Sequence, residues 1–150
     1  MQSIVIYLTI TSRRLCHFGN PEPDRDRKKQ VTVRSIGSAD MGGMPLEWLM
    51  NLGYSLDFEF VRQGQRFVYA NTINVSVTKM YKLEHEFNIH GPLHLLDKYA
   101  HHWLVEVSVQ VTQEGLAEHN SHVNNLKNFA GYLGGVVDLV QVDHSTFILK

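Results

Sequence analysis

The sequence predicts a mostly β fold of the α+β class, in which an antiparallel sheet of about eight strands curls, or closes into a barrel, with two helices at its rim. Apolar and polar residues alternate with period two over Thr72–Glu84 and His102–Thr112. Most strand-like segments are neighbours in the sequence and are joined by short turns, which favours antiparallel pairing. Helical spacing is confined to the segment after Pro45 and to Ser121–Leu133.

The first third of the chain is rich in residues that favour strands. Strands are expected at Ser3–Ile10, Arg13–Phe18 and Gln30–Ile36. The charged run Asp24–Lys29 is typical of a solvated loop. The small residues of Gly37–Gly43 predict a loop that leads into the first helix.

The first helix and the strand after it form the segment around which the chain is organised. Pro45 suits the first helical turn, and Gly53 is expected to end the helix in a left-handed conformation. Beyond Gly53 the period changes to two, with one set of residues apolar (Tyr54, Leu56, Phe58, Phe60) and the other polar (Ser55, Asp57, Glu59). We therefore expect Phe58 and Phe60 to be buried and Asp57 and Glu59 to be exposed. Gln63–Gln65 should then form a turn, and Phe67–Tyr69 the return strand.

The later elements follow the same rules. On Thr72–Glu84, Lys79 interrupts an apolar face and requires a polar cavity or a path to water for its ammonium group. The alternation of His102–Thr112 predicts that Val105 and Val107 are buried. Further predictions are a loop at Asn88–Lys98, a helix end at Gly134-Gly135 and strands at Val136–Val142 and Thr146–Leu149.

Composition excludes several classes of function. The 150 residues suit a single domain, and 43% hydrophobic and 19% charged residues suit a soluble protein. A net charge of −1 gives no overall basic field for binding nucleic acid or a membrane directly. Cys16 is the single cysteine, so no internal disulfide is possible. The apolar segment Ile4–Ile10 is too short to span a bilayer and has no preceding basic residues, so we interpret it as a strand rather than a signal peptide.

Two sets of residues could carry chemistry. The pairs Asp57/Glu59 and Glu84/Glu86 each place two carboxylates on one strand face. Inside a barrel, with Lys79, Lys82 and Arg66, they could bind a divalent metal and a polyphosphate, as in a tunnel-type triphosphate hydrolase; on a solvated face they would be ordinary surface carboxylates. The second set is histidine, at His90/His94, His101/His102 and His119/His122. Since no Cys-x-x-Cys or His-Glu-x-x-His accompanies them, we interpret them as surface residues and expect no metal or cofactor.

Two blocks of sequence resemble a known family. One contains Leu49-Met50-Asn51-Leu52-Gly53-Tyr54 and Asp57-Phe58-Glu59-Phe60-Val61, followed by Gly64 and Phe67. The other runs from Trp103-Leu104-Val105-Glu106-Val107-Ser108-Val109 to Leu126-Lys127-Asn128-Phe129-Ala130, Leu133, Leu139 and Val142-Asp143. Arg14-Leu15, Phe18-Gly19 and Pro21-Glu22 precede them. In this order, the residues resemble the family of subunit eighteen of the Mediator complex, in the Head module.

The resemblance implies a non-enzymatic subunit of a nuclear transcription coactivator that links regulators to RNA polymerase II. It implies a β-barrel related to triphosphate-tunnel enzymes, pairing with Mediator subunit twenty and receiving a C-terminal helix of subunit eight. Family members carry a further N-terminal region that Met1–Ser12 does not match, which implies a shortened chain or an alternative start. The partner-binding residues we expect lie on the two helices: Trp48, Leu52, Val123, Leu126, Phe129 and Leu133.

Overall fold

The computed structural model describes residues 4–8, 13–22, 31–43, 45–56, 58–85, 88, 91–95, 101–112 and 119–141. The chain groups into two compact units, Met1–Ser55 with Gly134–Lys150, and Leu56–Leu133, and each is described by itself. The described residues form seven strands and two helices, and every strand pairing is antiparallel. The predicted mostly β, antiparallel fold with two helices is therefore confirmed. The strands form two sheets rather than one closed barrel within the described ranges.

The first unit contains a three-stranded sheet in the order β1-β2-β3. Strand β2 (Arg13–Phe18) has the predicted bounds, and β1 (Ile4–Leu8) lies inside the predicted Ser3–Ile10. The predicted strand Gln30–Ile36 is wrong, because β3 (Ile36–Asp40) begins where that strand was expected to end. Small, exposed residues form β3 because the backbone of β2 pairs with them, from Phe18↔Ile36 to Arg14↔Asp40. Pairing with β2 therefore outweighs the weak strand preference of this segment.

The first helix, α1 (Pro45–Asn51), begins at the proline, as predicted, and Gly53 lies two residues beyond its end. Gly53 has φ +89°, in the left-handed region that glycine adopts without strain. The Gly53 N–H donates to the Met50 carbonyl at 2.9 Å, and the Tyr54 N–H donates to the Leu49 carbonyl at 3.1 Å. These two bonds form a Schellman motif, which satisfies the last carbonyls of the helix.

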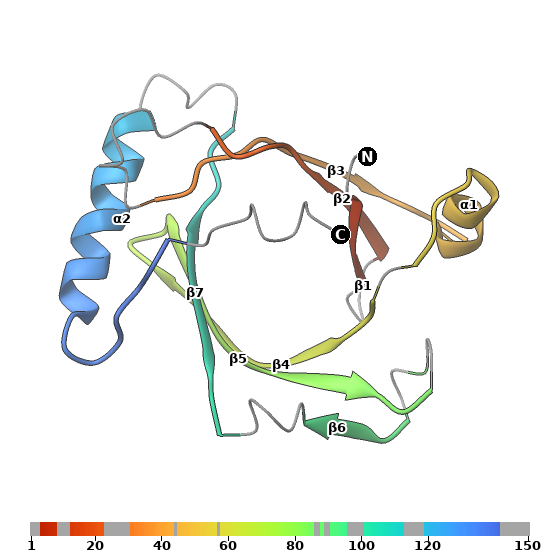
Figure 1. The fold of residues 1–150 in the computed structure, drawn as a ribbon. Helices are drawn as coiled ribbons and strands as arrows, with labels where there is room; N and C mark the ends of the chain where they lie inside the picture. The colour runs from red at the N-terminus through yellow and green to blue at the C-terminus, as the bar shows by residue number, and fades with distance from the viewer. Residues whose placement is uncertain are drawn as a thin grey trace. The chain divides into compact units, whose positions relative to one another are not determined.

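The second unit is built around the long central strand β5 (Ile73–Leu83), as predicted for Thr72–Glu84. Strand β4 (Val61–Tyr69) pairs with one side of β5, and β6 (Leu93–Leu95) and β7 (Leu104–Val109) pair with the other (Figure 1). Strand β6 lies in Asn88–Lys98, which was predicted to be a loop, so that prediction is wrong for these residues. The three residues of β6 are too few to show a period in the sequence.

The segment before β5 differs most from the prediction. No strand forms over the described part of residues 54–60, and Gln63–Gln65 is not a turn, because β4 runs without interruption through Gly64. The turn is instead in the three residues between Tyr69 and Ile73, where Ala70 and Asn71 have φ angles of 49° and 59° and the Thr72 N–H donates to the Tyr69 carbonyl at 3.2 Å. A Cβ at Gly64 would lie 2.0 Å from the Val77 carbonyl oxygen. This glycine thus marks a close approach of two strands rather than a turn.

On β7, the residues predicted to be buried are less exposed than their neighbours, as expected. Around Phe58, the predicted burial is wrong. Val105 and Val107 are half-buried, between exposed neighbours. Phe58 is 60% exposed, whereas Phe60 and Glu59 are both half-buried. The rings of Phe58 and Phe60 stack at 5.9 Å, so the two residues share a side. Alternation correctly predicts a shared side but cannot say which side is covered. Asp57 lies outside the described residues.

The second helix, α2 (His119–Leu133), ends before Gly134-Gly135, as predicted. It contacts β7, and the ring of Phe129 lies 4.8 Å from that of Tyr69 on β4. The predicted strand Val136–Val142 is wrong, since residues 136–141 are not in a strand; Thr146–Leu149 lies outside the described residues. Neither α1 nor α2, the helices of the described ranges, is long and apolar enough to cross a membrane.

Candidate functional site

The second unit carries its polar chemistry on one face of its sheet. The pairs Gly64↔Thr78, Arg66↔Ser76 and Ser76↔Glu106 place alternate residues of three strands side by side. The polar residues in register on this face are Arg62 and Arg66 of β4, Asn74, Ser76 and Thr78 of β5, and Glu106 and Ser108 of β7; Gly64, Val68, Met80 and Leu104 lie on the same face. The opposite face carries Val75, Val77, Val105 and Val107, as strand alternation requires.

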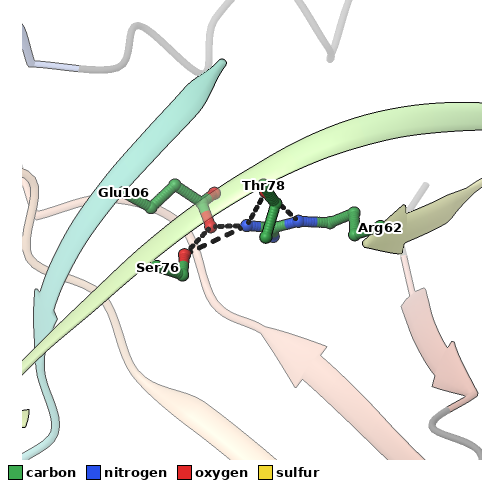
Figure 2. Close-up of polar contacts among 4 residues, drawn as sticks. All are labelled: Arg62, Ser76, Thr78 and Glu106. Carbon is green, nitrogen blue, oxygen red and sulfur yellow. Dashed lines mark hydrogen bonds and ion pairs between the residues drawn. The ribbon is translucent and has the colours of Figure 1, made fainter. Parts of the chain in front are cut away.

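Arg62 connects all three strands (Figure 2). Its guanidinium donates to Thr78 Oγ1 from Nε at 3.3 Å and from an Nη at 3.2 Å, and to Ser76 Oγ at 3.2 Å. The same Nη forms an ion pair with a carboxylate oxygen of Glu106 on β7. Ser76 Oγ also donates to that oxygen at 3.4 Å. Arg62 and Glu106 therefore join β4 to β7 across β5, with the Ser76 and Thr78 hydroxyls between them.

Other polar contacts on this sheet are more local. Arg66 donates from an Nη to Asn74 Oδ1 at 2.7 Å, joining β4 to β5. His94 Nε2 lies 3.7 Å from a carboxylate oxygen of Glu84, and both side chains are largely exposed. Contacts of this exposed kind contribute little to stability.

Lys79, which interrupts the apolar face of β5, has a favourable contact for its ammonium group. Its ammonium group lies over the ring of Trp103, 4.9 Å from the centroid. A cation over an indole ring is attracted by the negative face of the π system, so the interruption in the apolar face becomes a favourable contact. Trp103 remains more than half exposed, and it borders the covered part of this face.

In the first unit, an ion pair links β2 to β3. Arg14 Nε lies 2.8 Å from Asp40 Oδ1, at directly paired positions. The hydrogen bond from Arg14 and its positive charge lower the pKa of Asp40 below its ordinary value, and the same contact raises the pKa of Arg14.

The residues considered as an alternative site for metal chemistry are only partly described. Of the carboxylate pairs, Glu59 is half-buried and Glu84 is exposed beside His94, while Asp57 and Glu86 lie outside the described residues. His101 and His102 are exposed, as is His94. Across the described ranges, no group of three or more histidine, cysteine or acidic side chains could hold a metal ion.

The expected partner-binding residues fall into two groups. Trp48 on α1 and Leu52, the residue directly after α1, are 50% and 56% exposed; the Leu52 N–H donates to the Trp48 carbonyl, so the two residues are one helical turn apart. On α2, the four expected residues are half-buried, and Phe129 already contacts Tyr69 (Val123, Leu126, Phe129, Leu133). The helices belong to different units, so each is a separate candidate surface.

The sequence analysis did not predict the polar cluster of Figure 2, and only some of its residues could have been predicted from the sequence. Ser76, Thr78 and Glu106 occupy the polar positions of two correctly predicted strands, and that alternation could have placed them on one face. Arg62 could not be placed in the same way, because it precedes the segment Gln63–Gln65 that was interpreted as a turn.

The described residues define a mostly β protein with mutually bonded polar side chains and large apolar side chains left on its surface, a combination typical of proteins that bind other proteins. The chain belongs to the Med18 protein family, whose family model matches residues 9–147.

Two further comparisons agree with this assignment. The chain is similar to Mediator of RNA polymerase II transcription subunit 18 of Yarrowia lipolytica, with 27% identity over 138 residues; the match covers 91% of this chain and 58% of that protein. Its fold is similar to a chain in the structure of the Schizosaccharomyces pombe Mediator head module, with a TM-score of 0.71 and 21% identity. That match covers 87% of this chain and 64% of the other. The chain thus spans about three fifths of the length of these relatives.

Proposed function

We propose that this protein is a non-catalytic subunit of the Mediator head module, which acts in the nucleus to link regulators to RNA polymerase II. The observation that carries the proposal is the match of the Med18 family model to residues 9–147. The similarity to a curated Mediator subunit and to a fold found in a Mediator head module supports it. The proposal includes a β-barrel architecture related to that of the triphosphate-tunnel enzymes, as the resemblance implies.

The proposed partners are Mediator subunit twenty and the C-terminal helix of subunit eight, as the resemblance implies. The surface of α1 supports a contact of this kind, because Trp48 and Leu52 are one helical turn apart and half exposed. Large aromatic side chains at such positions commonly carry much of the binding energy of an interface. The four expected residues of α2 form the second proposed contact.

The observed polar contacts also support a role without catalysis. Glu106, the acidic residue in register on the described polar face, is paired with Arg62 and accepts a hydrogen bond from Ser76. These contacts give the Glu106 carboxylate a place in the bonding between strands. The comparisons give no support to the tunnel-type hydrolase that uses Asp57/Glu59 and Glu84/Glu86.

Co-expression with subunits twenty and eight tests the proposal. We expect the three chains to co-purify as one complex, and the double variant Trp48→Ala, Leu52→Ala to reduce the yield of that complex. Met50→Ala is the matched control, because Met50 is 55% exposed but lies on another side of α1.

Failure of the unaltered chain to co-purify would contradict the proposed function. Equal yields from the double variant and from Met50→Ala would contradict the assignment of α1 as the contact. Metal-dependent phosphate release from a nucleoside triphosphate, lost in the variant Glu84→Gln, Glu86→Gln, would instead favour the hydrolase.

A further inference from the structure

We propose that Arg62 and Glu106 are positioning residues: their ion pair, called here the brace, holds β7 against β5 and thereby fixes the α2 surface that a partner binds. The structural part of this inference concerns the second unit alone. Its last step, the effect on a partner, rests on the proposed function.

The brace connects strands that are not neighbours. Arg62 lies on β4 and Glu106 on β7, and both strands pair with β5 from opposite sides. Figure 2 shows the Arg62 side chain extending across β5 to the Glu106 carboxylate, with Ser76 and Thr78 alongside. The side chain of Arg62 is 23% exposed, whereas that of Glu106 is 51% exposed. The guanidinium is therefore the better shielded end, and shielding strengthens its charge-assisted hydrogen bonds.

Strand β7 has few other attachments among the described residues. It pairs with β5 over six residue pairs, from Thr78↔Leu104 to Ile73↔Val109, and its next largest contact, a much smaller one, is with α2. On the face that carries Glu106, the side chains of Leu104, Glu106 and Ser108 are exposed, so the apolar packing of the strand comes from the half-buried Val105, Val107 and Val109 on the other face. Glu106 lies near the middle of β7, where one cross-strand anchor restrains both of its halves.

The position of α2 depends in turn on β7. The helix contacts β7 and meets β4 through the rings of Phe129 and Tyr69. The brace connects the same two strands, β4 and β7, on the opposite face of the sheet. It therefore fixes the spacing of the two strands that support α2. The expected partner-binding residues Val123, Leu126 and Leu133 lie on this helix, so their positions depend on its position.

Hydrogen exchange on the isolated chain tests the structural step. Arg62→Met and Glu106→Gln should each speed amide exchange on β7 by about tenfold, the loss expected for one charged hydrogen bond. The double variant should exchange no faster than the faster single variant, because the two residues act through one contact. Arg66→Met is the matched control, since Arg66 lies on the same strand and face but bonds Asn74 on β5. Unchanged β7 exchange in Arg62→Met, or additive effects in the double variant, would overturn the brace. Glu106→Gln preserves side-chain size and keeps the test open if Arg62→Met fails to fold.

Affinity for Mediator subunits twenty and eight tests the second step. Arg62→Met should weaken binding by about tenfold, in proportion to the loosening of β7 and α2, and Arg66→Met should not. Looser β7 with unchanged affinity would overturn the positioning role. If the unaltered chain binds neither subunit, the proposed function fails, and exchange alone then decides for or against the brace.

Discussion

Among single residues, Arg14–Asp40 in the first unit and Arg62–Glu106 in the second are ion pairs between strands, and the two pairs differ in their surroundings. Arg62 is largely shielded, whereas Arg14 and Asp40 are both exposed. Water screens exposed pairs strongly, so the Arg14–Asp40 contact should affect titration more than stability. The contact lowers the pKa of Asp40 and raises the pKa of Arg14.

The first prediction concerns the pKa of Asp40. Because the hydrogen bond and charge of Arg14 lower this pKa in the folded state, Arg14→Met should raise it toward its ordinary value. The small stabilisation from the pair is present above the pKa of the unfolded chain and is lost as pH falls through the folded-state pKa. An NMR titration of the Asp40 carboxyl carbon measures the change directly. Lys82→Met serves as the control, and the same shift in that variant would contradict the assignment to Arg14.

At the scale of elements, two glycines in strands have different surroundings. Gly64 on β4 lies so close to β5 that a Cβ would be 2.7 Å from the Thr78 Cα as well as overlapping the Val77 carbonyl. Gly37 on β3 has no atom within 4 Å of the position that a Cβ would take. Packing against β5 therefore requires glycine at position 64, whereas a larger residue fits at position 37.

The second prediction uses this contrast. Gly64→Ala should lower the free energy of unfolding by about 1–3 kcal/mol, because β4 and β5 must separate to admit the methyl group. Gly37→Ala, also in a strand, should change it by less than about 0.5 kcal/mol. Urea unfolding of the two variants gives the comparison. An equal effect of the two substitutions would mean that β4 does not approach β5 as closely as the structure shows.

At the scale of the whole molecule, the chain keeps many large apolar side chains on its surface. Examples from both units are Trp48, Tyr54, Phe58, Phe67 and Trp103. The few apolar residues that are buried include Ile73, with 2% exposed, and Leu83, with 6%. A protein with so much apolar surface is expected to cover part of it with a partner.

The third prediction follows from this surface. Alone, the chain should self-associate, and a peptide of the C-terminal helix of subunit eight should raise its melting temperature. Binding to the folded state stabilises it by mass action, by about 2.7 kcal/mol at a hundredfold excess over Kd. Thermal melts with and without the peptide measure the shift. A monodisperse chain whose melting temperature does not change at saturating peptide would contradict helix docking.

The elements that depend on local pattern can be predicted from the order of residues alone. Strands β5 and β7 follow from alternation, α2 from its helical stripe, and the end of α1 from Gly53. The mostly β class and the resemblance to the Med18 family could also be inferred from the sequence, because both depend on the order of residues along the chain. Pattern of this kind reports backbone preference and shared faces, which are local properties.

Which segments pair and which faces are covered depends on contacts between parts of the chain that are distant in sequence. Strand β3 exists because β2 pairs with it, and Gly64 lies in a strand because β5 passes close to it. The exposure of Phe58 and the contact of Arg62 with Glu106 depend on residues far away in the sequence. Burial and cross-strand bonds are properties of two segments together, so the period of either segment alone cannot specify them.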